Sequence, residues 1–251
     1  MKIAVAGATG RLGRHVAEVL AERGHVVVPI SRATGVDVIS GTGLAEALDG
    51  VEVVVDAATG PSAEERPATD FFVTAAHNLQ EAGVRAGVRA AVVVSIIGIE
   101  RFTGGYGAAK VAHEQAWRSG PIPVRIVRAA QFHEFVGQLL EWGSRGEVSV
   151  VPEMRTQIVA ARAVAEVIAD VIEADAAGAG GSGTIEVAGP REETLAALAT
   201  ELAARQGSAA AVRAVRDPAD RDGEMQATGG LLPGPGALLV GPTFREWLAT
   251  Q

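Results

Sequence analysis

The chain has 251 residues, no cysteine, and a formal charge of −8 from 22 Lys and Arg against 30 Asp and Glu. The lack of cysteine excludes disulfide scaffolds, cysteine-ligated zinc sites and thiol catalysis. The acidic balance argues against sequence-independent DNA binding. The apolar N-terminal run is broken by Gly7 and Arg11 before it reaches the length of a signal peptide, and no segment has the length of a membrane span. We therefore expect a cytoplasmic protein with neither nucleic acid nor membrane as a partner.

Short apolar runs alternate with segments of helical periodicity through the first 142 residues. Strands are expected at 2–6, 25–30, 36–39, 51–55, 91–97 and 124–127. Helices are expected at 11–23, 43–49, 69–86, 106–119 and 131–142. Continuous apolar strands separated by helices are typical of a parallel sheet covered on both faces. The expected fold class is α/β, a Rossmann-like doubly wound parallel sheet.

The pattern is less regular after residue 143. Strands are expected at 147–151 and 184–187, helices at 161–174, 192–205 and 244–249, and a flexible Gly- and Ala-rich loop at 176–183. Because no linker is evident, we expect a single NAD(P)-binding domain over 1–251. Its dinucleotide-binding core would span 1–150, and a small C-terminal substrate-side lobe would span 151–251.

A glycine-rich loop, GATGRLG at residues 7–13, follows the first strand directly and opens a helix. Its first glycine permits the tight turn, its second lets backbone approach a pyrophosphate, and its third lets the helix pack close to the sheet. Free N–H groups and the helix dipole favour an anion there. A purely structural turn is the alternative. The predicted cofactor residues of this loop are Gly7, Thr9, Gly10, Arg11, Leu12 and Gly13.

The end of the second strand indicates which dinucleotide is bound. An acidic residue about 20 positions after the glycines would hold the ribose 2′-hydroxyl of NAD, but this strand ends in Ser31-Arg32. The Arg32 guanidinium can pair with a 2′-phosphate, with Ser31 assisting and Arg11 as a second candidate. We therefore expect NADP(H) rather than NAD(H), unless Arg32 is a solvated loop residue. Asp37 would face the adenine amine or serve the turn.

The only tyrosine, Tyr106, lies four residues before Lys110, one of two lysines in the chain. On a helix this spacing puts both side chains on one face. A neighbouring ammonium lowers the pKa of a phenol, which is about 10 when unperturbed. Ser95 ends the fifth strand, at the sheet edge where α/β proteins bind ligands. We expect catalytic roles for these three residues; the alternatives are a strand-end hydrogen bond and a structural pair.

With this loop and the Ser95…Tyr106-x-x-x-Lys110 arrangement, the chain resembles the short-chain dehydrogenase/reductase superfamily. It is most similar to the atypical, NmrA-like NAD(P)H-binding group, with further likeness at 127–132, 188–190 and 243–248. The resemblance implies a Rossmann fold, NADPH, Tyr106 as proton donor, Lys110 as its activator, and Ser95 as carbonyl binder. Lys110 can also contact the nicotinamide ribose.

The segment after the fourth strand departs from the family. It has DAATG at residues 56–60 in place of Asn-Asn-Ala-Gly, so the family's catalytic Asn has no counterpart. We nevertheless place Ala57 and Ala58 in the cofactor site. His113 and Glu114, on the Tyr106 helix, are expected at the surface, and His133 is expected to be a packing or surface residue. No cluster has metal-ligand spacing, so no metal is expected.

Together these features predict an NADP(H)-dependent oxidoreductase that transfers hydride to a small carbonyl or quinone substrate. One alternative is a non-catalytic redox sensor that binds the dinucleotide and signals to a protein partner. Another is a sugar-nucleotide epimerase, although the short region after the sixth strand counts against a bulky nucleotide sugar. The identity of the substrate depends on pocket loops and is left open, as is formation of a homo-oligomer.

Overall fold

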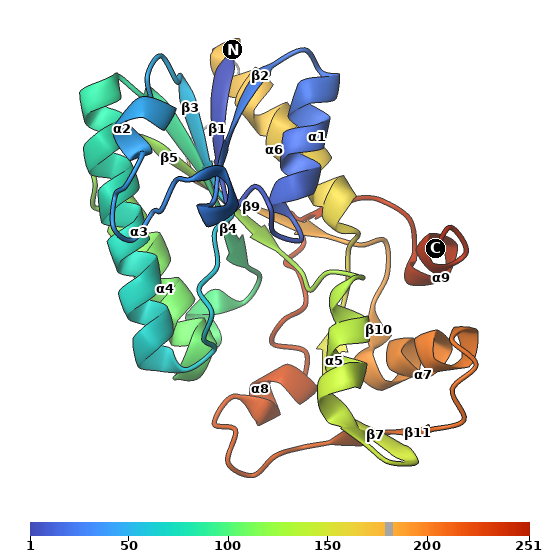
Figure 1. Ribbon diagram of the computed structural model, residues 1–251. Coiled ribbons are helices and arrows are strands. Elements are labelled where there is room, and N and C mark those ends of the chain that lie inside the picture. Colours follow the sequence, from blue (N-terminus) through green and yellow to red (C-terminus); the bar gives the residue numbers. More distant parts are fainter. Residues whose placement is uncertain (179–182) are drawn as a thin grey trace. The chain divides into compact units, whose positions relative to one another are not determined.

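The computed structural model describes residues 1–178 and 183–251, and its main feature is a seven-stranded sheet (Figure 1). The strand order is β12-β9-β5-β4-β3-β1-β2. The strands are β1 (Lys2–Ala6), β2 (Val26–Ile30), β3 (Val53–Asp56), β4 (Ala90–Ile96), β5 (Val124–Ala129), β9 (Gly183–Ala188) and β12 (Leu238–Leu239). β1 pairs in parallel with both β2 and β3, and β3 pairs in parallel with β4. The expected Rossmann-like α/β class is confirmed.

The chain forms two compact units, each made of several segments. Unit 1 comprises residues 1–95, 104–128 and 164–185, and unit 2 comprises residues 96–103, 129–163 and 186–251. The loop expected at 176–183 lies partly outside the described residues; of the rest, residue 176 ends α6 (Ala161–Ala176). The division of the chain at residue 150 stays a prediction.

Helices cover both faces of the sheet in unit 1. These are α1 (Gly13–Glu22), α2 (Leu44–Ala47), α3 (Glu65–Ala86), α4 (Gly105–Arg118) and most of α6. Figure 1 shows α3 and α4 side by side on one face and α1 and α6 on the other. Because the strands are covered on both faces, their apolar runs are continuous rather than alternating.

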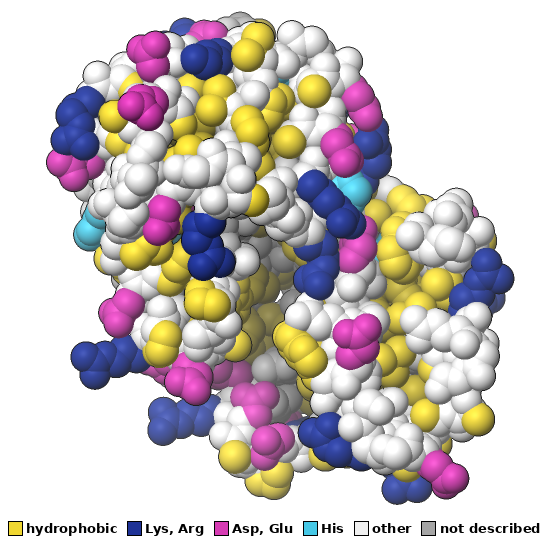
Figure 2. All heavy atoms as spheres, in the orientation of Figure 1, with side chains coloured by type: hydrophobic (Ala, Val, Ile, Leu, Met, Phe, Trp, Pro, Cys, Tyr) yellow, Lys and Arg dark blue, Asp and Glu magenta, His cyan; other side chains and the backbone are white. Residues whose placement is uncertain are grey.

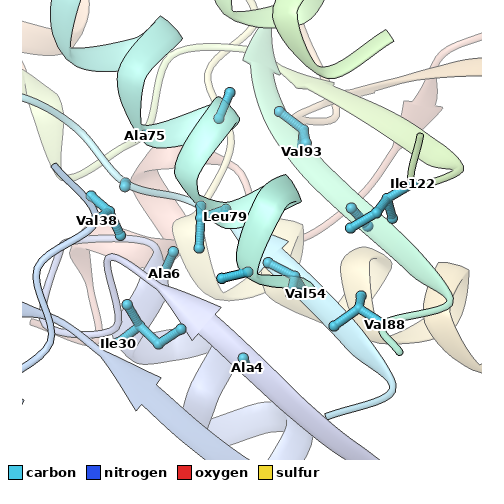
Figure 3. Close-up of a cluster of buried hydrophobic side chains, with 14 of the residues drawn as sticks. Ala4, Ala6, Ile30, Val38, Val54, Ala75, Leu79, Val88, Val93 and Ile122 are labelled. Carbon is cyan, nitrogen blue, oxygen red and sulfur yellow. The ribbon is translucent and has the colours of Figure 1, made fainter. Parts of the chain in front are cut away.

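The core of unit 1 is built from small and branched side chains. Ala4, Ala6 and Val54 of the sheet pack with Ala75 and Leu79 of α3 (Figure 3). All five are fully or almost fully buried. Removing apolar surface from water stabilises the fold by about 25 cal/mol per Å², so this interface fixes α3 on the sheet.

The strand expected at 36–39 is wrong. Ser31 instead caps a 3-10 turn at Arg32–Thr34, where its side chain accepts the Thr34 N–H at 3.3 Å. Asp37 then accepts the Ile39 N–H at 2.9 Å. Short polar side chains that bond the nearby backbone compete with sheet pairing, so this segment forms an ordered loop beside β2.

Unit 2 contains the helices expected at 131–142, 192–205 and 244–249 and the strand expected at 147–151, together with one helix and four short strands that periodicity did not reveal. The expected elements are α5 (Phe135–Gly143), α7 (Leu195–Arg205), α9 (Phe244–Leu248) and β7 (Val148–Pro152). The elements that periodicity did not reveal are α8 (Gly223–Ala227), β6 (Ser144–Arg145), β8 (Arg155–Thr156), β10 (Glu193–Thr194) and β11 (Ala211–Val215). β11 pairs in parallel with β7, and β10 pairs antiparallel with β8. α7 begins at residue 195 rather than 192 because β10 takes residues 193–194, and α5 begins at residue 135 rather than 131.

Surface charge is mixed. On the face drawn in Figure 2, Lys and Arg side chains alternate with Asp and Glu side chains. Within the described part of the chain, none of the helices combines the length and the apolar character needed to cross a membrane.

Candidate functional site

A cavity of about 680 Å³ lies in unit 1, at the carboxyl ends of β1, β2 and β3. Ligands of open α/β sheets bind in the crevice at this edge. The glycine loop, the turn after β2 and the segment after β3 supply its walls. The predicted cofactor residues that line it are Gly7, Thr9, Gly10, Ser31, Arg32, Asp37, Ala57 and Ala58.

Close packing of backbone on backbone shapes the glycine loop. Gly7 has φ +78°, and a Cβ added there would lie 2.7 Å from the Ala57 carbonyl oxygen. A Cβ on Gly13 would lie 2.0 Å from the Gly7 carbonyl oxygen. Real Cβ contacts are never this short, so only glycine fits at either position. The loop is therefore held between the start of α1 and the segment that follows β3.

The loop leaves backbone donors free at the start of α1. The Gly10 N–H closes the turn by donating to the Gly7 carbonyl at 2.8 Å. The N–H groups of Thr9, Leu12 and Gly13 have no acceptor within residues 1–178 and 183–251. Unpaired N–H groups at a helix N-terminus bind anions, because the helix dipole adds to their partial charge. These residues fit a dinucleotide pyrophosphate.

Arg32 lines the same cavity, in the turn that follows β2. Its side chain is exposed and forms no ion pair with any described residue. Ser31 differs, since its hydroxyl is engaged by the backbone N–H of Thr34. Arg32 is thus a cation of the cavity lining with no ion pair among the described residues, and Ser31 caps the turn that contains it.

Asn78 of α3 also belongs to this site, although its sequence position assigns it no role. Its side-chain N–H donates to the carbonyl oxygens of Val38 and Ile39, each at 2.8 Å. Both accepting residues line the cavity. No local pattern marks Asn78, because its partners lie about forty residues earlier in the chain. It holds the part of the cavity wall that Val38 and Ile39 form.

Lys110, Arg11, Leu12 and Gly13 are not among the residues that line the cavity. Gly13 contributes through its close approach to Gly7, and Leu12 through its free N–H. Lys110 is directed elsewhere. Its Nζ donates to the Val94 carbonyl oxygen at 2.7 Å and lies 2.8 Å from His113 Nδ1.

Lys110 belongs to a buried polar network between α4 and the sheet. His113 Nε2 lies 2.8 Å from Asp56 Oδ2, and the Trp117 indole N–H donates to the same oxygen at 2.8 Å. Asp56 and His113 are each 1% exposed and Lys110 is 5% exposed. The surface position expected for His113 is therefore wrong. Residues 110, 113 and 117 share one face of α4, and that face is turned inward.

Burial and charge together set the ionisation of this network. Burial lowers the pKa of Lys110 to about 8, against the opposing effects of Asp56 and Glu114. Burial and the Lys110 charge lower the pKa of His113. For Asp56, burial acts to raise the pKa, but His113 and Lys110 outweigh it and hold the pKa below its ordinary value. At neutral pH the network is an ammonium and a carboxylate joined by a neutral imidazole.

Glu114 is also buried, 2% exposed, which corrects its expected surface position. Arg128 donates to it at 2.9 and 3.0 Å, and Arg118 lies 2.8 Å away. Burial acts to raise its pKa, but the hydrogen bond from Arg128, with a smaller contribution from Ser95, keeps it low. The Ser95 hydroxyl is buried and has no partner of ordinary hydrogen-bond geometry among the described residues.

Tyr106 shares a helix face with Lys110, as the spacing predicted, but Phe72 of α3 packs against both. The Tyr106 ring meets the edge of Phe72 with centroids 5.6 Å apart, and Lys110 Nζ lies 4.5 Å from the Phe72 centroid. Burial raises the pKa of Tyr106 to about 12. The phenol therefore holds its proton throughout the neutral range.

His133, in unit 2, is a packing residue, one of the two roles expected for it. It is fully buried, its Nε2 lies 3.2 Å from the Ile158 carbonyl oxygen, and its ring meets the edges of Phe244 and Trp247. Burial lowers its pKa to about 4.

The raised pKa of Tyr106 gives a direct prediction, because the chain has one tyrosine. An ultraviolet titration of tyrosinate, with Tyr106→Phe as the blank, should show ionisation only near pH 12. Since the unfolded phenol ionises at 10.0, the free energy of unfolding should fall as pH rises from 10.0 to about 12. A midpoint below 10.0 with the native circular dichroism intact contradicts this burial effect.

Comparison with known proteins agrees with this geometry. A family model described as NAD(P)H-binding matches residues 7–175, well over half of the chain. None of the curated proteins compared with the chain matches it.

Three solved structures illustrate the similarity in fold. A dTDP-4-dehydrorhamnose reductase from Bacillus anthracis str. Ames, in complex with NADP, is 18% identical, with 98% of this chain and 96% of that chain covered and a TM-score of 0.73. A UDP-N-acetylglucosamine 4-epimerase from Bacillus cereus is 18% identical, with 100% and 94% covered and a TM-score of 0.71. A short-chain dehydrogenase/reductase superfamily protein from Agrobacterium tumefaciens with bound NAD is 21% identical, with 100% and 95% covered and a TM-score of 0.67.

These structures share the sheet and its flanking helices, and the matched segment contains the glycine loop and the whole cavity lining. The protein therefore belongs to the NAD(P)H-binding family and has the fold of a short-chain dehydrogenase/reductase.

Proposed function

We propose that this protein is an NADP(H)-dependent reductase of the NmrA-like group, acting on a carbonyl or quinone carbon of a small molecule. The observation that carries the proposal is the cavity in unit 1, which is lined both by the glycine loop, with its free backbone donors, and by Arg32, which has no acidic partner among the described residues. These two groups match the two anionic parts of NADPH, the pyrophosphate and the 2′-phosphate. When bound, the dinucleotide supplies the hydride.

Arg32 supports the choice of NADPH over NADH. A guanidinium binds a phosphate with two parallel hydrogen bonds, and such charged pairs are stronger than neutral ones. Arg32 has no acidic partner among the described residues to compete for those donors. In NAD-binding proteins, a carboxylate directly after the second strand holds the free ribose 2′-hydroxyl. The acidic residues that line this cavity are Asp37 and Asp70, and neither of them directly follows β2.

Tyr106 and Ser95 are the residues of this chain that we assign to the substrate. Tyr106 holds its proton at neutral pH and is the candidate donor to the developing alkoxide, since its pKa is about 12. Ser95 is the last residue but one of β4, near the carboxyl edge of the sheet, and its buried hydroxyl lacks a partner of ordinary hydrogen-bond geometry among the described residues. A hydroxyl in that state is suited to hold a carbonyl oxygen.

Replacing Arg32 tests the cofactor assignment. Arg32→Ala should weaken NADPH binding by about 1.5–3 kcal/mol, the scale of a charged hydrogen bond, and leave NADH binding nearly unchanged. Calorimetric titration with both dinucleotides measures this. Arg85→Ala removes the same charge from the far end of α3, where Arg85 pairs with Glu81, and should alter neither affinity. Equal losses for NADPH and NADH in Arg32→Ala contradict the assignment.

A second candidate function is dinucleotide sensing without turnover. One observation favours it: Lys110 is bound to Val94 and His113, and the pKa of Tyr106 is raised rather than lowered. In this case the cavity binds NADP(H) and a protein partner responds to its occupancy.

Tyr106→Phe distinguishes the two functions once an NADPH-oxidation screen over ketones, quinones and enones has found turnover. The change removes one hydroxyl and keeps the ring that packs on Phe72. If Tyr106 donates the proton, turnover should fall by roughly 10²–10⁴, the usual contribution of a positioned general acid. NADPH affinity should stay constant and serves as the internal control. Full activity in Tyr106→Phe would contradict the proton-donor role of Tyr106 and would not affect the assignment of the cofactor site.

A further inference from the structure

The N–H groups of the Lys110 ammonium are directed at groups inside the core. An ammonium has three N–H donors. One donates to the Val94 carbonyl oxygen at 2.7 Å, and a second points to His113 Nδ1 at 2.8 Å. The third side of the nitrogen faces the Phe72 ring, 4.5 Å from its centroid. The side chain is 5% exposed, and the one N–H without a hydrogen-bond acceptor among the described residues faces this ring rather than the cavity.

These contacts fix the direction of the hydrogen bonds from Lys110 to Asp56. Because an ammonium only donates, His113 Nδ1 must be the acceptor. The proton of the neutral imidazole then sits on Nε2, which donates to Asp56 Oδ2 at 2.8 Å. The neutral His113 ring therefore links the Lys110 ammonium by two hydrogen bonds to the Asp56 carboxylate, with which Lys110 forms no direct hydrogen bond.

Asp56 connects this charge chain to the cavity. Its Oδ1 accepts the backbone N–H of Ala58 at 3.1 Å, and Ala57 N–H donates to the Ala6 carbonyl at 3.0 Å. Ala57 and Ala58 line the cavity, but Asp56 does not. The Ala57 carbonyl lies so close to Gly7 that no side chain fits between them. A displacement of this wall would therefore also move the glycine loop.

We propose that Lys110 is the buried counter-charge of Asp56, and that the Lys110–His113–Asp56 chain positions the Ala57–Ala58 wall of the dinucleotide cavity. Lys110 then does not contact the cofactor, although the superfamily resemblance implies that it does. The effect on binding rests on the proposed cofactor site, whereas the charge pairing stands independently of it.

Breaking one member of a buried ion pair is far more costly than replacing both by uncharged groups. Lys110→Met and Asp56→Asn should therefore each lower the Tm of the cofactor-free protein, by roughly 6–20 °C for a chain of this size. The double variant buries no charge of this pair, and its Tm should lie above that of either single variant. Additive losses of Tm in the double variant overturn the charge pairing. If a single variant fails to fold, a folded double variant establishes the same coupling.

NADPH affinity separates this role from a direct cofactor contact. In Lys110→Met/Asp56→Asn, the asparagine oxygen can still accept the Ala58 N–H. His113, no longer held by Lys110, can change tautomer and accept the asparagine N–H at Nε2, and only the Trp117 N–H loses its acceptor. NADPH affinity should therefore stay within about threefold of the parent protein. A loss of tenfold or more in this variant, with its Tm restored, shows that Lys110 touches the cofactor and overturns the inference.

A matched variant tests the wall itself. Lys110→Met/Asp56→Ala is equally free of this buried charge but has no acceptor for the Ala58 N–H. Its affinity for NADPH and for NADH should fall about tenfold relative to the asparagine variant, by the same factor for both, because the wall is separate from Arg32. Equal affinities in the two double variants overturn the positioning role. If the parent protein binds neither NADPH nor NADH, the proposed function is overturned instead. The Tm values of the parent, the two single variants and Lys110→Met/Asp56→Asn still decide whether Lys110 and Asp56 are paired.

Discussion

The buried carboxylate of Asp56 is the constraint on which the site depends. A charge that is 1% exposed is tolerated only when it is paired and hydrogen-bonded. Asp56 satisfies this with donors from His113, Trp117 and Ala58. Two of these lie on α4 and one lies in the cavity wall. The same carboxylate therefore joins the helix that carries the catalytic candidates to the loop that carries the cofactor candidates.

This constraint explains why a familiar residue spacing gives an unusual local arrangement. Residues 106, 110, 113 and 117 form one stripe of α4. Because Asp56 requires His113 and Trp117, the stripe turns toward the sheet, and Lys110 turns with it. Tyr106, one turn earlier, packs on the edge of Phe72 and gains a high pKa from burial instead of a low one from Lys110. Spacing alone places side chains on one face, but their partners decide which hydrogen bonds they form.

Much of the fold followed from the sequence, because its signals are local. Continuous apolar strands, the loop at 7–13 and helix-ending glycines fixed the parallel sheet and its class. The strand expected at 36–39 was wrong because Ser31 and Asp37 bond the nearby backbone instead of leaving it for sheet pairing. β11 was missed because AVRAV is short and mostly exposed and is held by pairing with β7, about sixty residues away.

The site was less predictable, because its decisive contacts join distant parts of the chain. The surface positions expected for His113 and Glu114 were wrong, since a helix pattern does not show that Asp56 and Arg128 will meet them. Asn78 was passed over for the same reason, as its acceptors lie in the loop after β2. In contrast, the turn at Gly7 and the close packing at Gly13 are local requirements, and both are present in the structure.

The protonation state of His113 decides whether Lys110 is tied to Asp56. In protein labelled with ¹⁵N-histidine, and with His113→Gln to assign the signal among the five histidines, NMR reports which ring nitrogens carry protons. We expect a neutral ring at neutral pH, with a proton on Nε2 and none on Nδ1, which accepts the hydrogen bond from the Lys110 ammonium. A proton on Nδ1, in either the other tautomer or the imidazolium, would contradict it, because Lys110 would then lack the acceptor that ties it to Asp56.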